Sequence, residues 1–166
     1  MTESQQTTIA PEQVSKLRQL LMEELSHARL LHHRLSCERE LLKTPDPAGL
    51  QEMARRKSAS LQHLSQLANK RLQWMQQHKL PLADEFLQHP SIMHSSTLVE
   101  LWQQLATWYE KNRQLSQILS EIVLTNRLRV QKRLQILQGK KDQTTLLYNK
   151  QGHSQQGGGK NGYISA

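Results

Sequence analysis

The chain has 166 residues with only 4% aromatic residues, seven glycines and five prolines, a composition that excludes turn-rich β architecture. Leucine, glutamine, glutamate, lysine, arginine and alanine dominate, and because these residues lose little rotamer freedom in a helix, they predict an all-α protein. A hydrophobic fraction of 36% is too low for a thick core and fits helices that each bury one narrow stripe. The net charge of +8 is uneven, since residues 127–166 carry eight basic residues against Asp142.

No segment approaches the roughly 20 consecutive apolar residues that a bilayer-spanning helix requires, and the first residues lack the basic and apolar regions of a signal peptide. The single cysteine, Cys37, excludes an internal disulfide and agrees with a reducing compartment. We therefore expect a cytoplasmic protein without membrane insertion.

The first predicted helix follows a polar segment, residues 1–10, which we expect to be disordered. Apolar residues then recur at intervals of three and four from Val14 to Leu42. This periodicity predicts an amphipathic helix over about residues 12–43.

A proline-rich connection separates the first helix from the second. Pro45 and Pro47 lack backbone donors and push the preceding residue out of the helical region, so the first helix must stop before them. Asp46 can cap the next helix with Pro47 at its first position, and this second helix is expected over about residues 48–77. So short a connection favours an antiparallel hairpin.

The third long helix follows a crossover that contains two prolines and a short predicted helix over about residues 82–89. Apolar positions from Leu98 to Ile122 keep an unbroken heptad register, and Gly139 is placed to end the helix, which is expected over about residues 97–138. The sequence thus predicts an elongated, coiled-coil-like three-helix bundle over residues 11–141 and a flexible basic tail over residues 142–166.

The last part of the third helix has more apolar residues than three helices can cover. Past Ile122 the register slips to Val123, Val130, Leu134 and Leu137, and further apolar residues occupy other flanks. The third helix is also about ten residues longer than either hairpin helix, roughly 15 Å, so its end is expected to project past the hairpin. This excess predicts a surface for another chain, either a second copy or a different protein.

No arrangement of residues predicts catalysis or a cofactor. His33 and Cys37 share one helical face with His32 and His27 nearby, but zinc needs three or four converging ligands, so no metal site is predicted. The acidic pairs Glu23/Glu24 and Glu38/Glu40 are expected on exposed flanks, where nothing would adapt their pKa values to acid–base work. The glycines before Lys160 lack the spacing of a phosphate loop. We therefore predict a protein that is not an enzyme.

The basic residues near the end of the third helix leave two alternatives open. A nucleic-acid-binding helical bundle would explain the charge of Arg127, Arg129 and Arg133 but not the apolar residues between them. A structural coiled-coil homo-oligomer would explain the apolar residues. Among the tryptophans, Trp108 is expected in the core and Trp102 against the crossover.

The layout of the chain resembles a known family. The third helix ends in Leu134-Gln-Ile-Leu137, and Leu147-Tyr148-Asn-Lys-Gln-Gly152 follows about ten residues later, similar to a Leu-Tyr-Gly-x-x-Gly motif. The segment around Lys57 also resembles a second helix with a central lysine. On these features residues 12–152 resemble the FlgN family of flagellar export chaperones. Two positions depart from the family pattern: Asn149 replaces a glycine, and Leu119-Ser120 stands where an Asn-Gly pair is usual.

This resemblance implies a cytoplasmic chaperone of flagellar type III protein export that works without a cofactor. Its expected partners are the C-terminal helices of hook-associated proteins, which it would keep unpolymerised and deliver for flagellum assembly, with components of the export apparatus as further candidate partners. Basic side chains would steer an acidic helix towards the surface. The expected partner-binding residues are Ile122, Val123, Arg127, Arg129, Val130, Arg133, Leu134, Leu137, Leu147 and Tyr148.

Overall fold

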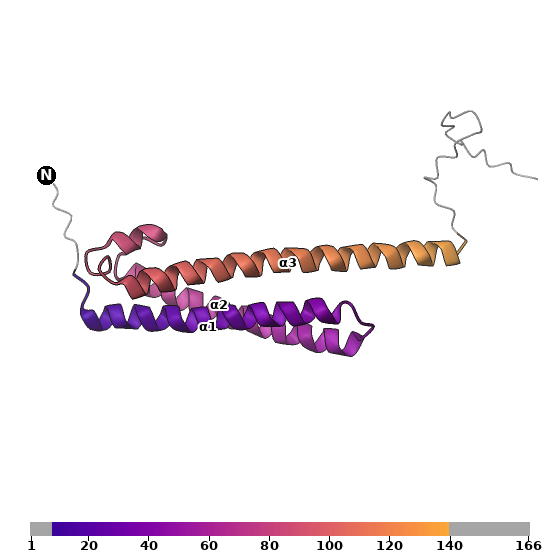
Figure 1. The fold of residues 1–166 in the computed structure, drawn as a ribbon, viewed down its shortest axis with the longest axis horizontal. Helices are drawn as coiled ribbons and strands as arrows, with labels where there is room; N and C mark the ends of the chain where they lie inside the picture. Colours follow the sequence, from indigo (N-terminus) through magenta and orange to yellow (C-terminus); the bar gives the residue numbers. More distant parts are fainter. Residues whose placement is uncertain (1–7, 140–166) are drawn as a thin grey trace, which may run out of the picture. The chain divides into compact units, whose positions relative to one another are not determined.

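The computed structural model describes residues 8–139 and confirms the all-α prediction (Figure 1). The elements in chain order are α1 (Pro11–Leu41), α2 (Pro47–Gln77), the 3-10 helix η1 (Asp84–Gln88) and α3 (Ser96–Leu137), with no strand among these residues. The bounds agree with the predicted helices to within about two residues. The predicted tail, with Leu147 and Tyr148, lies outside the described residues.

The chain divides into two compact units, which are described separately. The first unit extends to Ile122 and contains α1, α2, η1 and the first part of α3. The second unit begins at Val123 and contains the remainder of α3.

The turn between α1 and α2 forms as the prolines predicted. Asp46 caps α2, because its Oδ1 accepts a hydrogen bond from the backbone N–H of Gly49 at 2.9 Å, and Pro47 occupies the first helical position. The Thr44 hydroxyl donates to the carbonyl of Leu41, one of the last carbonyls of α1 that no helical N–H can reach. These local bonds satisfy both helix ends and leave a short antiparallel connection.

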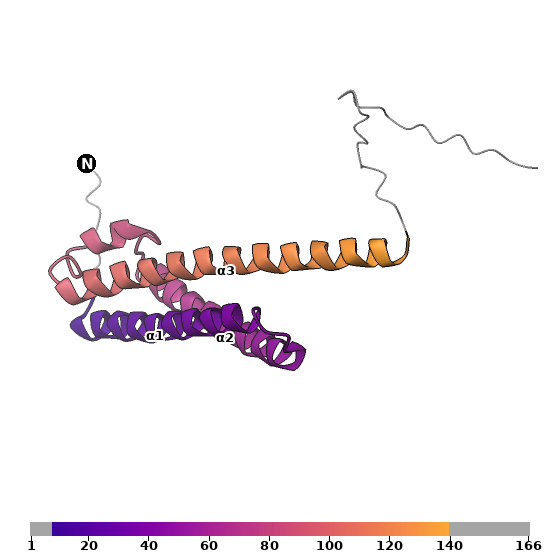
Figure 2. The ribbon, with the colours of Figure 1, turned by 45° about the vertical axis from the view of Figure 1, so that its right-hand side comes forward.

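The first part of α3 packs beside the hairpin and runs parallel to α1, as Figures 1 and 2 both show. The hydroxyl of Tyr109 donates to Glu24 of α1, and the side-chain amide of Asn112 donates to the backbone carbonyl of Ala28. The later residue of α3 therefore contacts the later residue of α1, as parallel helices require. The heptad prediction is confirmed in part. Leu98, Leu105, Asn112, Leu115 and Leu119 are buried, whereas the heptad positions Leu101 and Trp108 are only partly buried.

The core of the first unit lies mainly along α1. The buried residues of α1 are Leu17, Leu21, Glu24, Leu25, Ala28, Leu31, Leu35 and Glu38. On α2 the buried line differs from a simple apolar stripe, since Leu61 is 49% exposed while Ser60 and Arg71 are buried. Arg34 and Glu24 of α1 hydrogen-bond to these two polar residues. The same face of α2 also buries Leu64, Leu67, Trp74 and Met75.

The crossover between α2 and α3 covers the opposite end of the bundle from the turn. Phe86 and Ile92 are fully buried. Trp102 meets Phe86 edge to face at 4.9 Å and donates from its indole N–H to Asp84 at 2.6 Å. This confirms the prediction that Trp102 packs against the crossover.

The start of the described chain corrects one prediction. Residues 1–10 were expected to be disordered, but Ile9 is 5% exposed and its backbone N–H donates to the hydroxyl of Ser91 at 3.1 Å. The prediction is wrong at Ile9 because the crossover, distant in sequence, provides a site for this side chain. Residues 1–7 lie outside the described part.

A buried polar network links all three helices and corrects a second prediction. Glu24 was expected on an exposed flank, but its side chain is 0% exposed and forms a salt bridge with Arg71 at 2.7 Å. The hydroxyl of Tyr109 donates to the same carboxylate at 2.7 Å. Burial, together with this hydrogen bond, raises the pKa of Tyr109. Because a buried charge must be paired, this network favours one register of the three helices.

Candidate partner-binding surface

The second unit presents an apolar stripe on one face of α3, which we call the C-terminal stripe: Val123, Val130, Leu134 and Leu137. Their spacing of i, i+7, i+11 and i+14 places these residues on one side of the helix. All four are exposed, by 49%, 55%, 49% and 82% of their surface. By contrast, Leu115 and Leu119 in the first unit are 6% and 3% exposed. Ile122, the last residue of the first unit, is partly buried.

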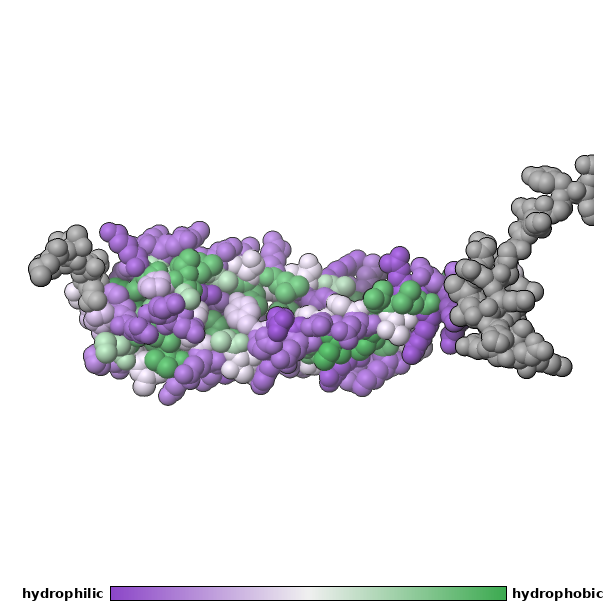
Figure 3. Space-filling view, turned by 90° about the horizontal axis from the view of Figure 1, so that it is seen from above, coloured by the Kyte–Doolittle hydropathy of each residue, from purple (hydrophilic) through white to green (hydrophobic). Residues whose placement is uncertain are grey.

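Apolar residues are exposed on other sides of the same segment as well. Leu124, Leu128 and Ile136 are 57%, 56% and 65% exposed. Figure 3 shows hydrophobic residues reaching the surface over this part of α3, among hydrophilic side chains. Exposed apolar surface of this density is typical of an interaction site. Whether this end projects past the hairpin stays a prediction.

Positive charge borders the C-terminal stripe. Around the helix axis, Arg127 lies on one side of the stripe, and Arg129 and Arg133 lie on its other side, as the period of 3.6 residues per turn requires. All three are exposed. Within residues 123–139 no acidic residue occurs in the sequence, and none of the salt bridges formed within the described chain involves these arginines. The surface therefore combines an apolar centre with a basic rim.

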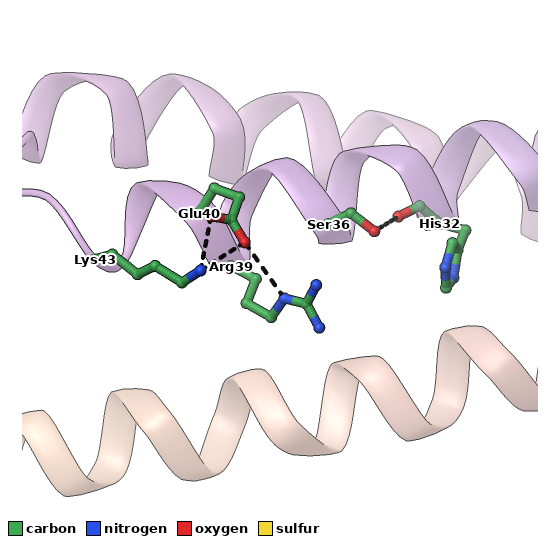
Figure 4. Close-up of polar contacts among 5 residues, drawn as sticks. All are labelled: His32, Ser36, Arg39, Glu40 and Lys43. Carbon is green, nitrogen blue, oxygen red and sulfur yellow. Dashed lines mark hydrogen bonds and ion pairs between the residues drawn. The ribbon is translucent and has the colours of Figure 1, made fainter.

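The acidic pair Glu38/Glu40 has no arrangement for acid–base catalysis. Glu38 was expected on an exposed flank, but it is only 9% exposed, so this prediction is wrong. The physical reason is that Lys57 of α2 forms a salt bridge with its carboxylate at 2.7 Å. Glu40 is exposed and pairs with Lys43 at 2.7 Å and Arg39 at 3.7 Å (Figure 4). The hydrogen bond from Lys43 lowers the pKa of Glu40, the opposite of what a general acid needs.

The histidines near Cys37 point to different partners. His33 Nε2 lies 3.7 Å from the Cys37 Sγ, at the surface. His32 instead hydrogen-bonds to Asn112 at 3.1 Å and meets Trp108 edge to face at 5.2 Å. His27 lies against His63 of α2. The four side chains considered from the sequence therefore do not converge on one point.

Trp108 is only partly buried, although its heptad position predicted core. Lys111 and Arg29 lie over its ring, at 4.5 Å and 5.9 Å from the ring centre. These cations contact the indole ring by cation–π interaction. Sequence reasoning missed this arrangement because Arg29 comes from α1.

The comparison with known families decides the general role. The model of the FlgN family, described as FlgN protein, matches residues 2–156. The chain belongs to the FlgN family. This family is one of flagellar export chaperones, so the chain has a general chaperone role in flagellum assembly and export, and no enzymatic activity is known for the family.

The other comparisons add no relative. No curated protein and no solved structure matches the chain significantly. Within residues 8–139, no helix has the length and apolar character needed to cross a membrane.

Proposed function

We propose that this FlgN family member binds the C-terminal helices of hook-associated proteins in the cytoplasm, keeps them from polymerising and delivers them to the type III export apparatus. The docking surface is the C-terminal stripe with Ile122, and Leu147 and Tyr148 close over the bound helix. The observation that supports this assignment is the exposure of the stripe: four apolar side chains on one helical face, each about half exposed or more.

The size of the stripe fits a reversible complex. Full burial of a Val or Leu side chain contributes about 1.5–3 kcal/mol. Val123, Val130 and Leu134 are about half exposed and Leu137 is 82% exposed, so each contributes roughly 1–2 kcal/mol on docking. Association and the ordering of side chains oppose binding by several kcal/mol, so the net affinity is moderate. A helical partner can then be released without ATP hydrolysis.

The basic rim selects for acidic partners. Arg127, Arg129 and Arg133 attract an acidic amphipathic helix and orient it before apolar contacts form. Because these side chains are exposed, salt screens the attraction, and the association rate falls as ionic strength rises.

The decisive experiment changes the stripe and compares it with a matched control. The double variant Val130→Asp/Leu134→Asp places two carboxylates in the stripe, whereas Gln131→Asp/Gln135→Asp adds the same charge to the same segment off the stripe. Binding to a peptide of the C-terminal helix of a hook-associated protein is measured by calorimetry. We expect at least a 100-fold loss of affinity for the first variant, about 2.8 kcal/mol, and less than a 5-fold change for the second, below about 1 kcal/mol.

Two further measurements separate the proposal from its rivals. Circular dichroism must show equal helicity for both variants, since all four positions are exposed and none supports the described core. Equal loss of binding in both variants would refute the stripe as the docking surface. Light scattering that shows a stable dimer of the free protein would assign the stripe to a second copy, and affinity for random duplex DNA that falls steeply with salt would favour nucleic acid instead.

A further inference from the structure

A second group of functional side chains lies on the hairpin of the first unit, where α1 faces α2. Glu23 and His27 are four residues apart on α1 and so share one face, and His63 approaches from α2. The ligand-capable atoms of the three side chains all lie within 4.8 Å of one another. The rings of His27 and His63 meet edge to face, with centres 4.2 Å apart.

Two imidazoles and one carboxylate are a recognised set of metal ligands. Zn²⁺ accepts His nitrogen and carboxylate oxygen, and sites with three protein ligands complete a tetrahedron with water. His27 is partly buried while Glu23 and His63 are exposed, so a fourth position open to solvent is available.

The charges around the group are compatible with a cation. The carboxylate of Glu23 offsets part of the ion's charge. Arg34, one of the cations near the group, is held by the backbone carbonyl of Arg56 and the hydroxyl of Ser60.

From this geometry we propose that Glu23, His27 and His63 bind a divalent transition-metal ion, with Zn²⁺ as the principal candidate. The ion joins α1 to α2 by coordinate bonds and stabilises the hairpin, because it binds the folded arrangement and not the unfolded chain. This role is independent of partner binding by the C-terminal stripe. It was not visible from the sequence, because His63 meets Glu23 and His27 only through the hairpin.

Zn²⁺ binding to the full chain, without a histidine tag and freed of metal, tests the proposal. Calorimetry is expected to show one saturable site, and Co²⁺ is expected to give the visible absorption bands of tetrahedral coordination. His63→Ala and Glu23→Gln alter exposed side chains and should fold normally. Each is expected to weaken binding by more than the roughly 10–100-fold that loss of an outer-shell partner of a metal site causes.

Control variants identify the site that binds. His33→Ala, Cys37→Ser and His94→Ala each remove another potential ligand outside the group and are expected to leave the Zn²⁺ affinity unchanged. Zn²⁺ is also expected to raise the melting temperature of the unaltered protein but not of His63→Ala. The proposal is overturned if no Zn²⁺ binds, if His63→Ala binds as well as the unaltered protein, or if Cys37→Ser abolishes binding.

Discussion

The buried pair of Glu24 and Arg71 allows a stringent test of how the helices are held together. We consider Arg71→Ala, which removes the cation and leaves the Glu24 carboxylate in a site where its side chain is 0% exposed. The hydroxyl of Tyr109 still donates one hydrogen bond but brings no charge. Removal of one partner of a buried ion pair costs about 3–5 kcal/mol, because the remaining charge is desolvated and uncompensated.

This loss is large enough to measure by thermal unfolding. For a chain of this size 1 kcal/mol shifts the melting temperature by about 2–4 °C, so Arg71→Ala is expected to lower it by about 6–20 °C. Arg113→Ala is the matched control, since Arg113 and Glu110 form a salt bridge in which the side chains remain 72% and 47% exposed. The control is expected to change stability no more than other surface substitutions.

A double substitution distinguishes the buried charge from simple loss of packing. Glu24→Leu/Arg71→Met keeps the volume and removes both charges, and is expected to recover most of the stability that Arg71→Ala loses. Equal melting temperatures for Arg71→Ala and Arg113→Ala would refute the reasoning. So would a double variant that is less stable than Arg71→Ala.

Three further predictions follow from individual contacts. The pKa of Tyr109 is raised in the folded protein, so its contribution to stability is fully present below the ordinary tyrosine pKa of about 10 and is lost as the pH rises through the higher folded value. Denaturant unfolding at alkaline pH should show this loss of stability, and the loss should be smaller in Tyr109→Phe. Asp46→Ala removes the cap of α2 and is expected to destabilise the protein by about 1 kcal/mol in urea unfolding, whereas no effect would mean that the cap does not stabilise the turn. Leu64→Ala, at a site 4% exposed, is expected to cost about 2–5 kcal/mol, while Leu61→Ala, at a site 49% exposed, should cost under 1 kcal/mol; the reverse order would contradict the orientation of α2 described above.

Local signals predicted most of the helical layout. Pro45 and Pro47 end α1 and start α2 because a proline lacks a donor and restricts its neighbour, effects that need no tertiary context. Gly139 adopts φ of 67°, which glycine accepts without strain, so the end of α3 was also predictable. The heptad from Leu98 to Leu119 lies on one face of α3 as expected, with Leu101 and Trp108 partly buried and the other positions buried, since a sustained period already specifies one face.

The exposure of apolar residues on the last part of α3 was predictable for a related reason, while partner binding by these residues stays a prediction. The register slip after Ile122 and the basic residues beside it are features of the linear pattern, and the exposure of Val130, Leu134 and Leu137 agrees with that pattern. The two acidic pairs were interpreted wrongly at Glu24 and Glu38, where Arg71 and Lys57 of α2 provide the compensating charge. No pattern within α1 could indicate these partners.

The sequence by itself therefore determined where helices begin and end and which stretch of α3 has apolar residues on several sides. Only the tertiary structure decided which polar groups are buried and which side chains meet, as with Glu24 and Tyr109 or His27 and His63. The physical reason is that helix formation and helix termination depend on residues within one or two turns. A buried charge or a shared ligand group depends on side chains that the chain brings together only after the helices have packed.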